Sequence, residues 1–161
     1  MVTGVIIPAD ERLAVSRHEF NHLRDYQGVV GGLVEAIDLD HPQMTFFAND
    51  EAKLIGLPIN RRATIIWWLH NPITYGFDVL CGDAVLVGQP DQNGDTQSAP
   101  AEFISLLMDT PSFRVDVQTS GPDTPWYSND TRFEDYFTAA LCAVDLTHRW
   151  AQVTRARVVA A

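Results

Sequence analysis

Residues 56–69 constrain the fold more than any other stretch of the sequence. A Gly-Leu-Pro turn leads to Asn60, a residue type that caps helices, and then to the adjacent cations Arg61 and Arg62. The apolar run 65–69 follows, and its composition suits a buried strand as well as a helix. We predict a helix because the cap signal is local and an Asn-Pro pair gives a stop immediately afterwards. The strand remains the alternative, and in either case the fold is built around this segment.

The two arginines need an explanation, because cations in the first turn of a helix oppose its dipole at a cost of about 0.3–1 kcal/mol each. One hypothesis is that Arg61 or Arg62 forms a bidentate pair with Glu35 or Asp83. The alternative is an anion-binding site, in which the free amides after Asn60 and both guanidinium groups converge on a phosphate or carboxylate.

The composition indicates one acidic domain. With 161 residues and 46% apolar residues, the chain is long enough to bury one core. Its 11 basic and 21 acidic residues give a net charge of −10. We therefore expect no direct binding to nucleic acid or to an anionic membrane surface, since both need a basic face. The charge favours cationic partners, including protein sites that normally hold DNA.

Two further features bear on location. No apolar run approaches the length of a membrane span, and the first residues lack the basic and apolar regions of a signal peptide. Cys81 and Cys142 lie among apolar residues, which predicts buried thiols in a reducing compartment, with one disulfide as the alternative. We expect a cytoplasmic protein.

Apolar periodicity and turn residues predict short elements in the first 100 residues. We expect a strand at 2–7 and a second short strand at 13–15. A helix of about three turns, through Phe20, Leu23 and Tyr26, should follow and end at Gly31. Residues 33–39 and 44–48 should then form a hairpin. The apolar segments 75–80 and 84–87 predict another hairpin or one kinked strand. Residues 89–100 form a polar loop and are the best candidate for a boundary.

In the remaining residues we predict a helix at 101–108, a half-buried strand at 113–117, and a closing amphipathic helix that starts at 128–131 and runs to about residue 153. Arg149, Arg155 and Arg157 would lie at the carboxyl end of that helix and complement its dipole. The fold class is therefore α+β: a single domain over residues 1–161, with a mixed or antiparallel sheet of short strands, helices packed on it and a C-terminal amphipathic helix.

The sequence contains no recognised catalytic motif. His18 and His22 are four residues apart, a spacing that can place two zinc ligands on one helix face, but we interpret them as an exposed pair at a helix start. A nucleophile elbow, a Walker loop and a dinucleotide-binding pattern do not occur. The sequence favours a protein without catalytic residues, bound metal or cofactor.

Acidic residues concentrate in one part of the chain. Between residues 89 and 145 there are ten acidic and two basic residues, which accounts for −8 of the net charge. One interpretation is a solvated face that keeps the protein soluble. The other is a partner surface that imitates the charge spacing of a nucleic-acid backbone. The candidate contact residues are Asp91, Asp95, Glu102, Asp109, Asp123, Asp130, Glu134 and Asp135.

Four blocks, in this order, resemble a small domain family of unknown function. They are Val-Ile-Ile-Pro at 5–8, Gly-Gly-Leu-Val-Glu-Ala at 31–36, the segment 49–64 with Gly-Leu-Pro-Ile-Asn-Arg-Arg-Ala-Thr at its end, and Gly-Asp-Ala-Val-Leu-Val-Gly at 82–88. The resemblance covers about residues 1–90 and leaves residues 91–161 as an acidic extension. It implies an α+β fold and a setting in phages, plasmids or integrated elements of Gram-positive bacteria, with no established activity.

Two functional hypotheses follow. The first is a non-enzymatic accessory protein of a phage or mobile element that binds a host or defence protein through its acidic surface, in the cytoplasm of the bacterial host cell. The alternative is a small-anion or nucleotide-binding protein centred on Arg61 and Arg62. The partner and the oligomeric state do not follow from the sequence.

Overall fold

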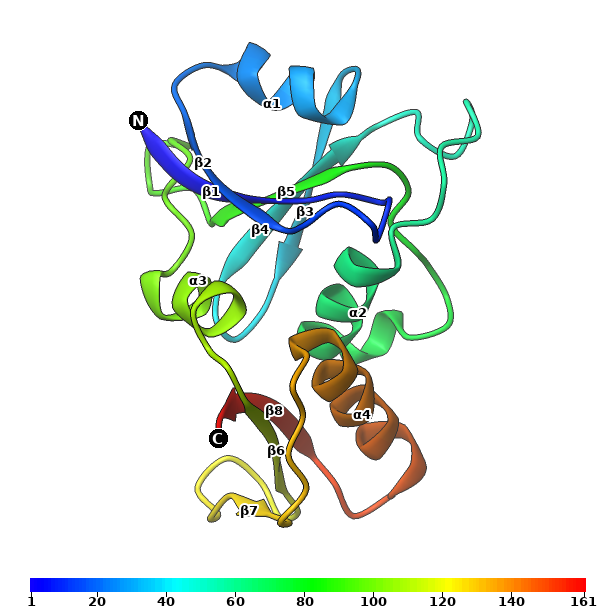
Figure 1. Cartoon of the computed structure of the whole chain (residues 1–161), viewed down its shortest axis with the longest axis vertical. Helices are drawn as coiled ribbons and strands as arrows, with labels where there is room; N and C mark the ends of the chain where they lie inside the picture. Colours follow the sequence, from blue (N-terminus) through cyan, green and yellow to red (C-terminus); the bar gives the residue numbers. More distant parts are fainter.

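The computed structural model describes residues 1–161 and confirms the α+β class. It contains a five-stranded and a three-stranded sheet, both antiparallel, and four α-helices. The larger sheet and α1 occupy the upper part of Figure 1, and the smaller sheet lies at the lower end. Helices α2 and α4 pack against each other between these two parts.

The larger sheet has the strand order β2-β1-β5-β4-β3. Its strands are β1 (Val2–Ile7), β2 (Ser16–Phe20), β3 (Val34–Leu39), β4 (Met44–Asn49) and β5 (Ala84–Gly88). The central strand β5 is buried over its whole length, which fits its continuous apolar sequence. The predicted strand at 2–7 and the hairpin of β3 with β4 are confirmed.

Two predictions near the amino terminus were wrong in position. The strand that pairs with β1 is Ser16–Phe20 and not 13–15, because this edge strand carries polar residues on its exposed face and gives little apolar signal. Helix α1 (Leu23–Val30) consequently has about two turns, since Phe20 belongs to β2. Its end is as expected: Gly31 adopts a positive φ of 78°, which a glycine tolerates without strain.

Helix α2 (Arg61–His70) confirms the prediction for the central segment. Asn60 caps its first turn, and a short 3₁₀ turn, η1 (Pro72–Thr74), follows its end. The predicted strand at 75–80 does not form. Its backbone instead joins α2, because the Leu80 N–H donates to the Thr64 hydroxyl at 3.0 Å and the Leu80 carbonyl accepts from the Asn60 N–H at 2.7 Å.

The remaining elements are α3 (Ala101–Met108), β6 (Phe113–Gln118), β7 (Tyr127–Ser128), α4 (Tyr136–Arg149) and β8 (Arg155–Ala160), with strand order β7-β6-β8. Helix α3 and strand β6 confirm the predictions for 101–108 and 113–117. One apolar cluster of 23 buried residues includes side chains from both sheets and from α2, α3 and α4. Cys81 and Cys142 are both free thiols.

The closing helix was predicted with the wrong limits. It begins at Tyr136, because Phe133 forms a bridge with Phe113 and the Asp135 carboxylate accepts from the Thr138 N–H at 2.7 Å. It ends at Arg149, and the chain returns as β8 along the whole of β6. Arg155 and Arg157 therefore lie on a strand and do not complement the helix dipole. None of the helices is long and apolar enough to cross a membrane.

Candidate functional site

Arg62 is a buried structural residue in this fold, with 8% of its surface exposed. Its Nη2 donates to three backbone carbonyl oxygens in the loop between β1 and β2, those of Pro8 at 2.8 Å, Asp10 at 3.2 Å and Leu13 at 2.9 Å. Its guanidinium also lies 5.9 Å from the ring centre of Phe137 on α4. Arg62 therefore ties the loop to two helices.

Arg61 is exposed and forms an ion pair with Glu11 at 3.3 Å. The predicted partners, Glu35 and Asp83, were wrong for both arginines. Asp83 instead accepts a hydrogen bond from the Ala9 N–H at 2.9 Å. The physical reason is tertiary: the β1–β2 loop folds over the start of α2 and offers its own carbonyl oxygens and the Glu11 carboxylate to these cations.

Asn60 is fully buried, and all its side-chain bonding capacity is directed into the protein. Its amide group donates to the carbonyl oxygens of Ile7 at 2.7 Å and Gly82 at 2.9 Å, and its Oδ1 accepts from the Ala63 N–H at 3.0 Å. An anion beside the arginines would therefore find no free group on Asn60.

A cavity of about 370 Å³ does lie beside Arg61 and Arg62. It is also lined by three carboxylates, those of Glu11, Glu134 and Asp135. Among the buried side-chain atoms of its lining residues, only the Arg62 Nε lacks a hydrogen-bond partner. Two cations facing three anions give no net attraction for a phosphate, so the geometry does not favour the anion-binding hypothesis at this place.

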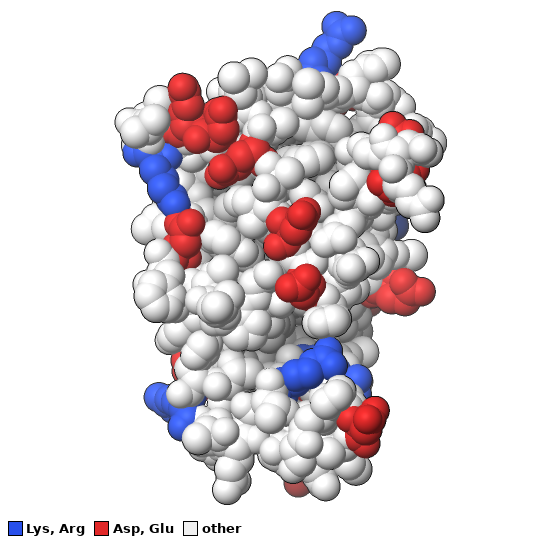
Figure 2. Space-filling view, turned by 180° about the vertical axis from the view of Figure 1, so that it is seen from behind, with Lys and Arg blue, Asp and Glu red and all other residues white.

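The eight predicted contact acids are all exposed, and no Lys or Arg side chain forms an ion pair with any of them. They lie in the 89–100 loop, on α3, at its end, in the loops around β7 and just before α4. On the face shown in Figure 2 some acidic side chains adjoin one another at the upper left and others are separated by uncharged residues, and basic groups appear at the top, at the upper left and at the lower end.

The net charge also divides unevenly at residue 112. Residues 113–161 contain six acidic and five basic residues, a net of −1, so residues 1–112 carry −9. Asp116, one of the ten acids counted between 89 and 145, is only 2% exposed and pairs with Arg114 and Arg157. The first 112 residues therefore carry an excess of nine acids, whereas after residue 112 the arginines offset most of the acids.

Four large apolar side chains, Leu54, Ile55, Ile59 and Phe77, are exposed on this acidic part, and we call them the apolar patch. Leu54 is 87% and Phe77 89% exposed. Two neighbouring chain segments carry it: Lys53 forms an ion pair with Asp78, and Ile59 forms a β-bridge with Cys81. The sequence did not indicate the patch, because Phe77 was assigned to the predicted apolar segment 75–80 and the two neighbouring segments are brought together only in the fold.

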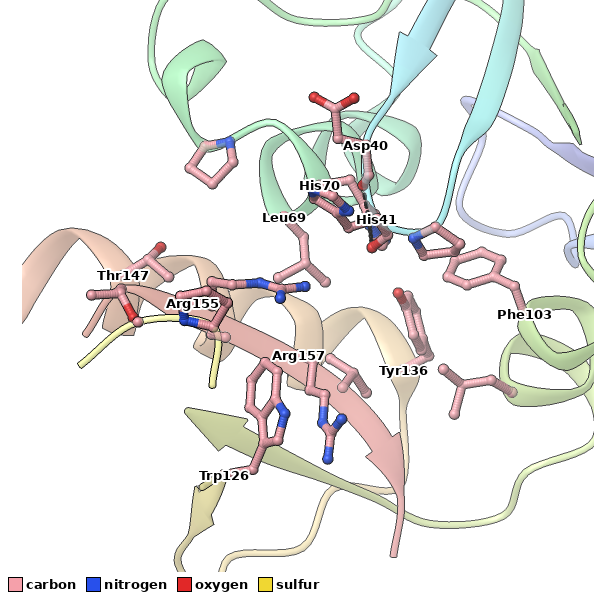
Figure 3. Close-up of a pocket in the computed structure, with 18 residues that line it drawn as sticks. Asp40, His41, Leu69, His70, Phe103, Trp126, Tyr136, Thr147, Arg155 and Arg157 are labelled. Atoms are coloured by element: carbon pink, nitrogen blue, oxygen red, sulfur yellow. Dashed lines mark hydrogen bonds between the residues drawn. The ribbon is translucent and has the colours of Figure 1, made fainter. Parts of the chain in front are cut away.

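The largest cavity, of about 740 Å³, lies where the C-terminal strands meet the rest of the protein (Figure 3). One wall comes from the turn between β3 and β4, the end of α2, and α3. The other comes from α4, β8 and the loop between β6 and β7. Its apolar lining includes Leu69, Phe103, Leu106, Trp126 and Val158. The sequence did not indicate it, since it depends on β8.

Arg155, Arg157 and Tyr136 are the polar side chains of the C-terminal wall that bear on ligand binding. Arg155 has no carboxylate partner, and its guanidinium lies 5.5 Å from the ring centre of Trp126. Arg157 stacks on the same ring at 4.0 Å and is paired with Asp116 at 3.1 Å. The Tyr136 hydroxyl points into the cavity without a hydrogen bond to the protein, and burial raises the pKa of this phenol, so it is neutral.

His70 lies on the opposite wall. Its Nδ1 is within 3.0 Å of the His41 carbonyl oxygen and 3.2 Å of that of Asp40. Because carbonyl oxygens only accept, Nδ1 carries the hydrogen and donates, which leaves Nε2 as an acceptor. That Nε2 is buried and has no partner. Burial lowers the pKa of His70, so the ring is neutral near pH 7.

A pH dependence of stability follows from His70. Because its pKa is lower in the folded than in the unfolded chain, the unfolded chain binds a proton first as the pH falls below about 6.5. We expect the free energy of unfolding to fall between pH 7.5 and 5.5 by at most about 1.4 kcal/mol per pH unit. Urea denaturation at several pH values should show that the free energy of unfolding depends less steeply on pH in His70→Gln than in the wild type. Equal slopes would contradict this assignment.

The pair His18 and His22 does not form a metal site. The segment 18–22 reads His-Glu-Phe-Asn-His, the spacing of a zinc-protease motif, which our interpretation from the sequence did not recognise. That motif requires a helix, whereas here His18 lies on β2 and His22 precedes α1, both exposed. Nowhere in the structure do three His, Cys, Asp or Glu side chains come together as ligands of a metal ion.

Comparison with known proteins places this fold in a family. Residues 2–112 match the family model described as Domain of unknown function (DUF3846), and the chain belongs to this family. The match extends past residue 90, where the resemblance in the sequence ended, and includes the 89–100 loop and α3. Neither a curated protein nor a solved structure matches the chain. The family region thus supplies the apolar patch and one wall of the largest cavity.

Proposed function

We propose that this protein is a non-enzymatic accessory protein of a phage or another mobile element and acts by binding a host or defence protein. The observation that carries the proposal is the apolar patch, where Leu54 and Phe77 are almost completely exposed. Several large exposed apolar side chains on neighbouring segments are more typical of a protein contact than a single one. The mobile-element setting rests on the four sequence blocks that resemble families of such elements.

The charges around the patch favour a cationic partner. A small cavity of about 190 Å³ beside Leu54 is lined by the carboxylates of Glu35, Asp50 and Asp78, and its one cation, Lys53, is already paired with Asp78. An apolar centre with a charged rim is the usual anatomy of an interface. The fitting partner is a protein segment with apolar side chains flanked by Lys or Arg, such as a site that normally holds DNA.

The eight contact acids have a supporting role in this proposal. They are exposed and unpaired but have no comparable group of apolar neighbours, so they would attract a cationic partner over a distance and speed its association. If these acids imitate the charge spacing of a DNA backbone, they would attract a cationic partner in the same way. The patch would provide the contact that slows dissociation.

The test starts with capture of the partner from the natural host, followed by affinity measurements on the purified pair. The double variant Leu54→Ser/Phe77→Ser should bind at least about tenfold more weakly, a loss of about 1.4 kcal/mol. Replacing Asp91, Asp95, Glu102 and Asp109 by their amides should mainly lower the association rate and its salt dependence. Leu23→Ser, an exposed apolar change on α1, is the matched control. Wild-type affinity of the double variant would refute the proposal, as would failure to capture any partner.

A further inference from the structure

We infer that the 740 Å³ cavity binds a small organic anion that has a planar ring. Its volume lies within the range of ordinary ligand sites. The walls are mostly apolar and aromatic, with few polar groups, which is the composition such sites share. Both the DUF3846 region and the C-terminal part contribute, so the complete fold is needed to form it.

The anionic end of the ligand is assigned to Arg155. In a protein with a net charge of −10, this arginine has no carboxylate partner, and stacking near Trp126 keeps its guanidinium along the cavity wall. The only acidic residue in the lining is Asp40, which Figure 3 shows on the opposite wall with its carboxylate turned away from the two arginines. An unpaired guanidinium is suited to a carboxylate or a phosphate, which it can bind through two parallel hydrogen bonds.

Arg157 adds to the positive potential, although it is already paired with a carboxylate. Its charge is shared with Asp116, which also pairs with Arg114 at 3.0 Å. Two arginines thus share one buried carboxylate, and together with the unpaired Arg155 they leave this side of the cavity positive.

The other end of the ligand is defined by Tyr136 and His70. The Tyr136 hydroxyl is a neutral donor and acceptor that the protein leaves without a partner, and the buried His70 Nε2 is an acceptor without a donor. Because buried polar atoms are normally hydrogen-bonded, the His70 Nε2 fits a ligand that carries an N–H or O–H donor, and the Tyr136 hydroxyl can bond to the same ligand. Phe103 lies between them, with ring centres 5.7 Å from His70 and 5.9 Å from Tyr136, and offers a face or edge to a ring.

The ligand class is therefore a planar ring with an N–H or O–H donor, joined to a carboxylate or phosphate. Nucleoside monophosphates and aromatic carboxylates with an indole or phenol ring share this chemistry. The site would be independent of the apolar patch, whose residues do not line it. Loss of one function by mutation should leave the other intact.

The experiment uses the full-length protein and three sets of probes. The first set is the four common nucleoside monophosphates, and the second is indole-3-carboxylate and 4-hydroxybenzoate. The third set holds two controls: adenosine, which has a ring but no anionic group, and inorganic phosphate, which is an anion without a ring. Binding is followed by the rise in melting temperature and by the shift of the Trp126 indole N–H signal in NMR spectra. We expect one of the first two sets to bind with a Kd below about 1 mM, and both controls to bind more weakly.

Variants separate the contributions of the cavity residues. Arg155→Met should weaken binding of the best probe at least about tenfold, and Tyr136→Phe, which keeps the packing, should weaken it by a smaller factor. Arg149→Met removes an exposed arginine from the end of α4 outside the cavity and should change nothing. Failure of every ring-bearing anion to bind, binding of inorganic phosphate as strong as that of the best probe, or equal binding to Arg155→Met would each overturn the assignment.

Discussion

Replacing Asn60 with alanine is expected to lower the free energy of unfolding by about 3–5 kcal/mol. The side chain makes three hydrogen bonds in a fully buried position, and each has a partner that would be left unsatisfied. Loss of the helix cap alone costs about 0.5–2 kcal/mol. The two bonds to the carbonyl oxygens of Ile7 and Gly82 account for the rest, since a buried acceptor without its donor costs about 1–3 kcal/mol.

Urea denaturation of Asn60→Ala and Asn60→Ser measures these two parts separately. Serine can still cap α2 but is too short to bridge to both carbonyl oxygens, so it should recover about 1 kcal/mol of the loss. If Asn60→Ala lost less than about 1 kcal/mol, Asn60 would not join β1, the 81–83 turn and α2 as its hydrogen bonds indicate.

Local signals in the sequence were sufficient to predict helix α2 but not the tertiary contacts of its cap residue. The cap residue and the Asn-Pro stop are within a few residues of the segment that they limit, and α2 formed where they predicted it. The same holds for β1, for the hairpin of β3 with β4 and for α3, whose patterns are complete within each element. The carbonyl partners of Asn60 lie 53 and 22 residues away, so no local pattern could identify them.

The errors at the carboxyl end have a similar cause. An apolar stripe continues from α4 towards Val153, and it favoured a longer helix, while the pairing of β8 with β6 joins residues about 40 apart in the sequence. That pairing moved Arg155 and Arg157 from a helix end to the wall of a cavity. Both the 740 Å³ cavity and the apolar patch depend on which distant segments become neighbours, so only the fold could reveal them.

Arg62 provides the second large effect. Arg62→Met keeps an unbranched apolar chain of similar length but removes every donor, and we expect the free energy of unfolding to fall by about 2–4 kcal/mol. Three carbonyl oxygens, those of Pro8, Asp10 and Leu13, would lose a charged donor, and the one at Pro8 is buried. The β1–β2 loop should then separate from α2 before the rest of the protein unfolds.

Arg61→Met is the matched control, one residue away. Arg61 makes a single exposed ion pair with Glu11, so its replacement should cost no more than about 1 kcal/mol. Hydrogen exchange distinguishes the two: the amides of residues 9–15 should exchange faster in Arg62→Met and at the wild-type rate in Arg61→Met. If both variants behaved alike, the two arginines would share one role. A stabilising or neutral Arg62→Met would instead mean that burying this cation opposes folding, as expected for a residue kept to bind a ligand rather than to hold the loop.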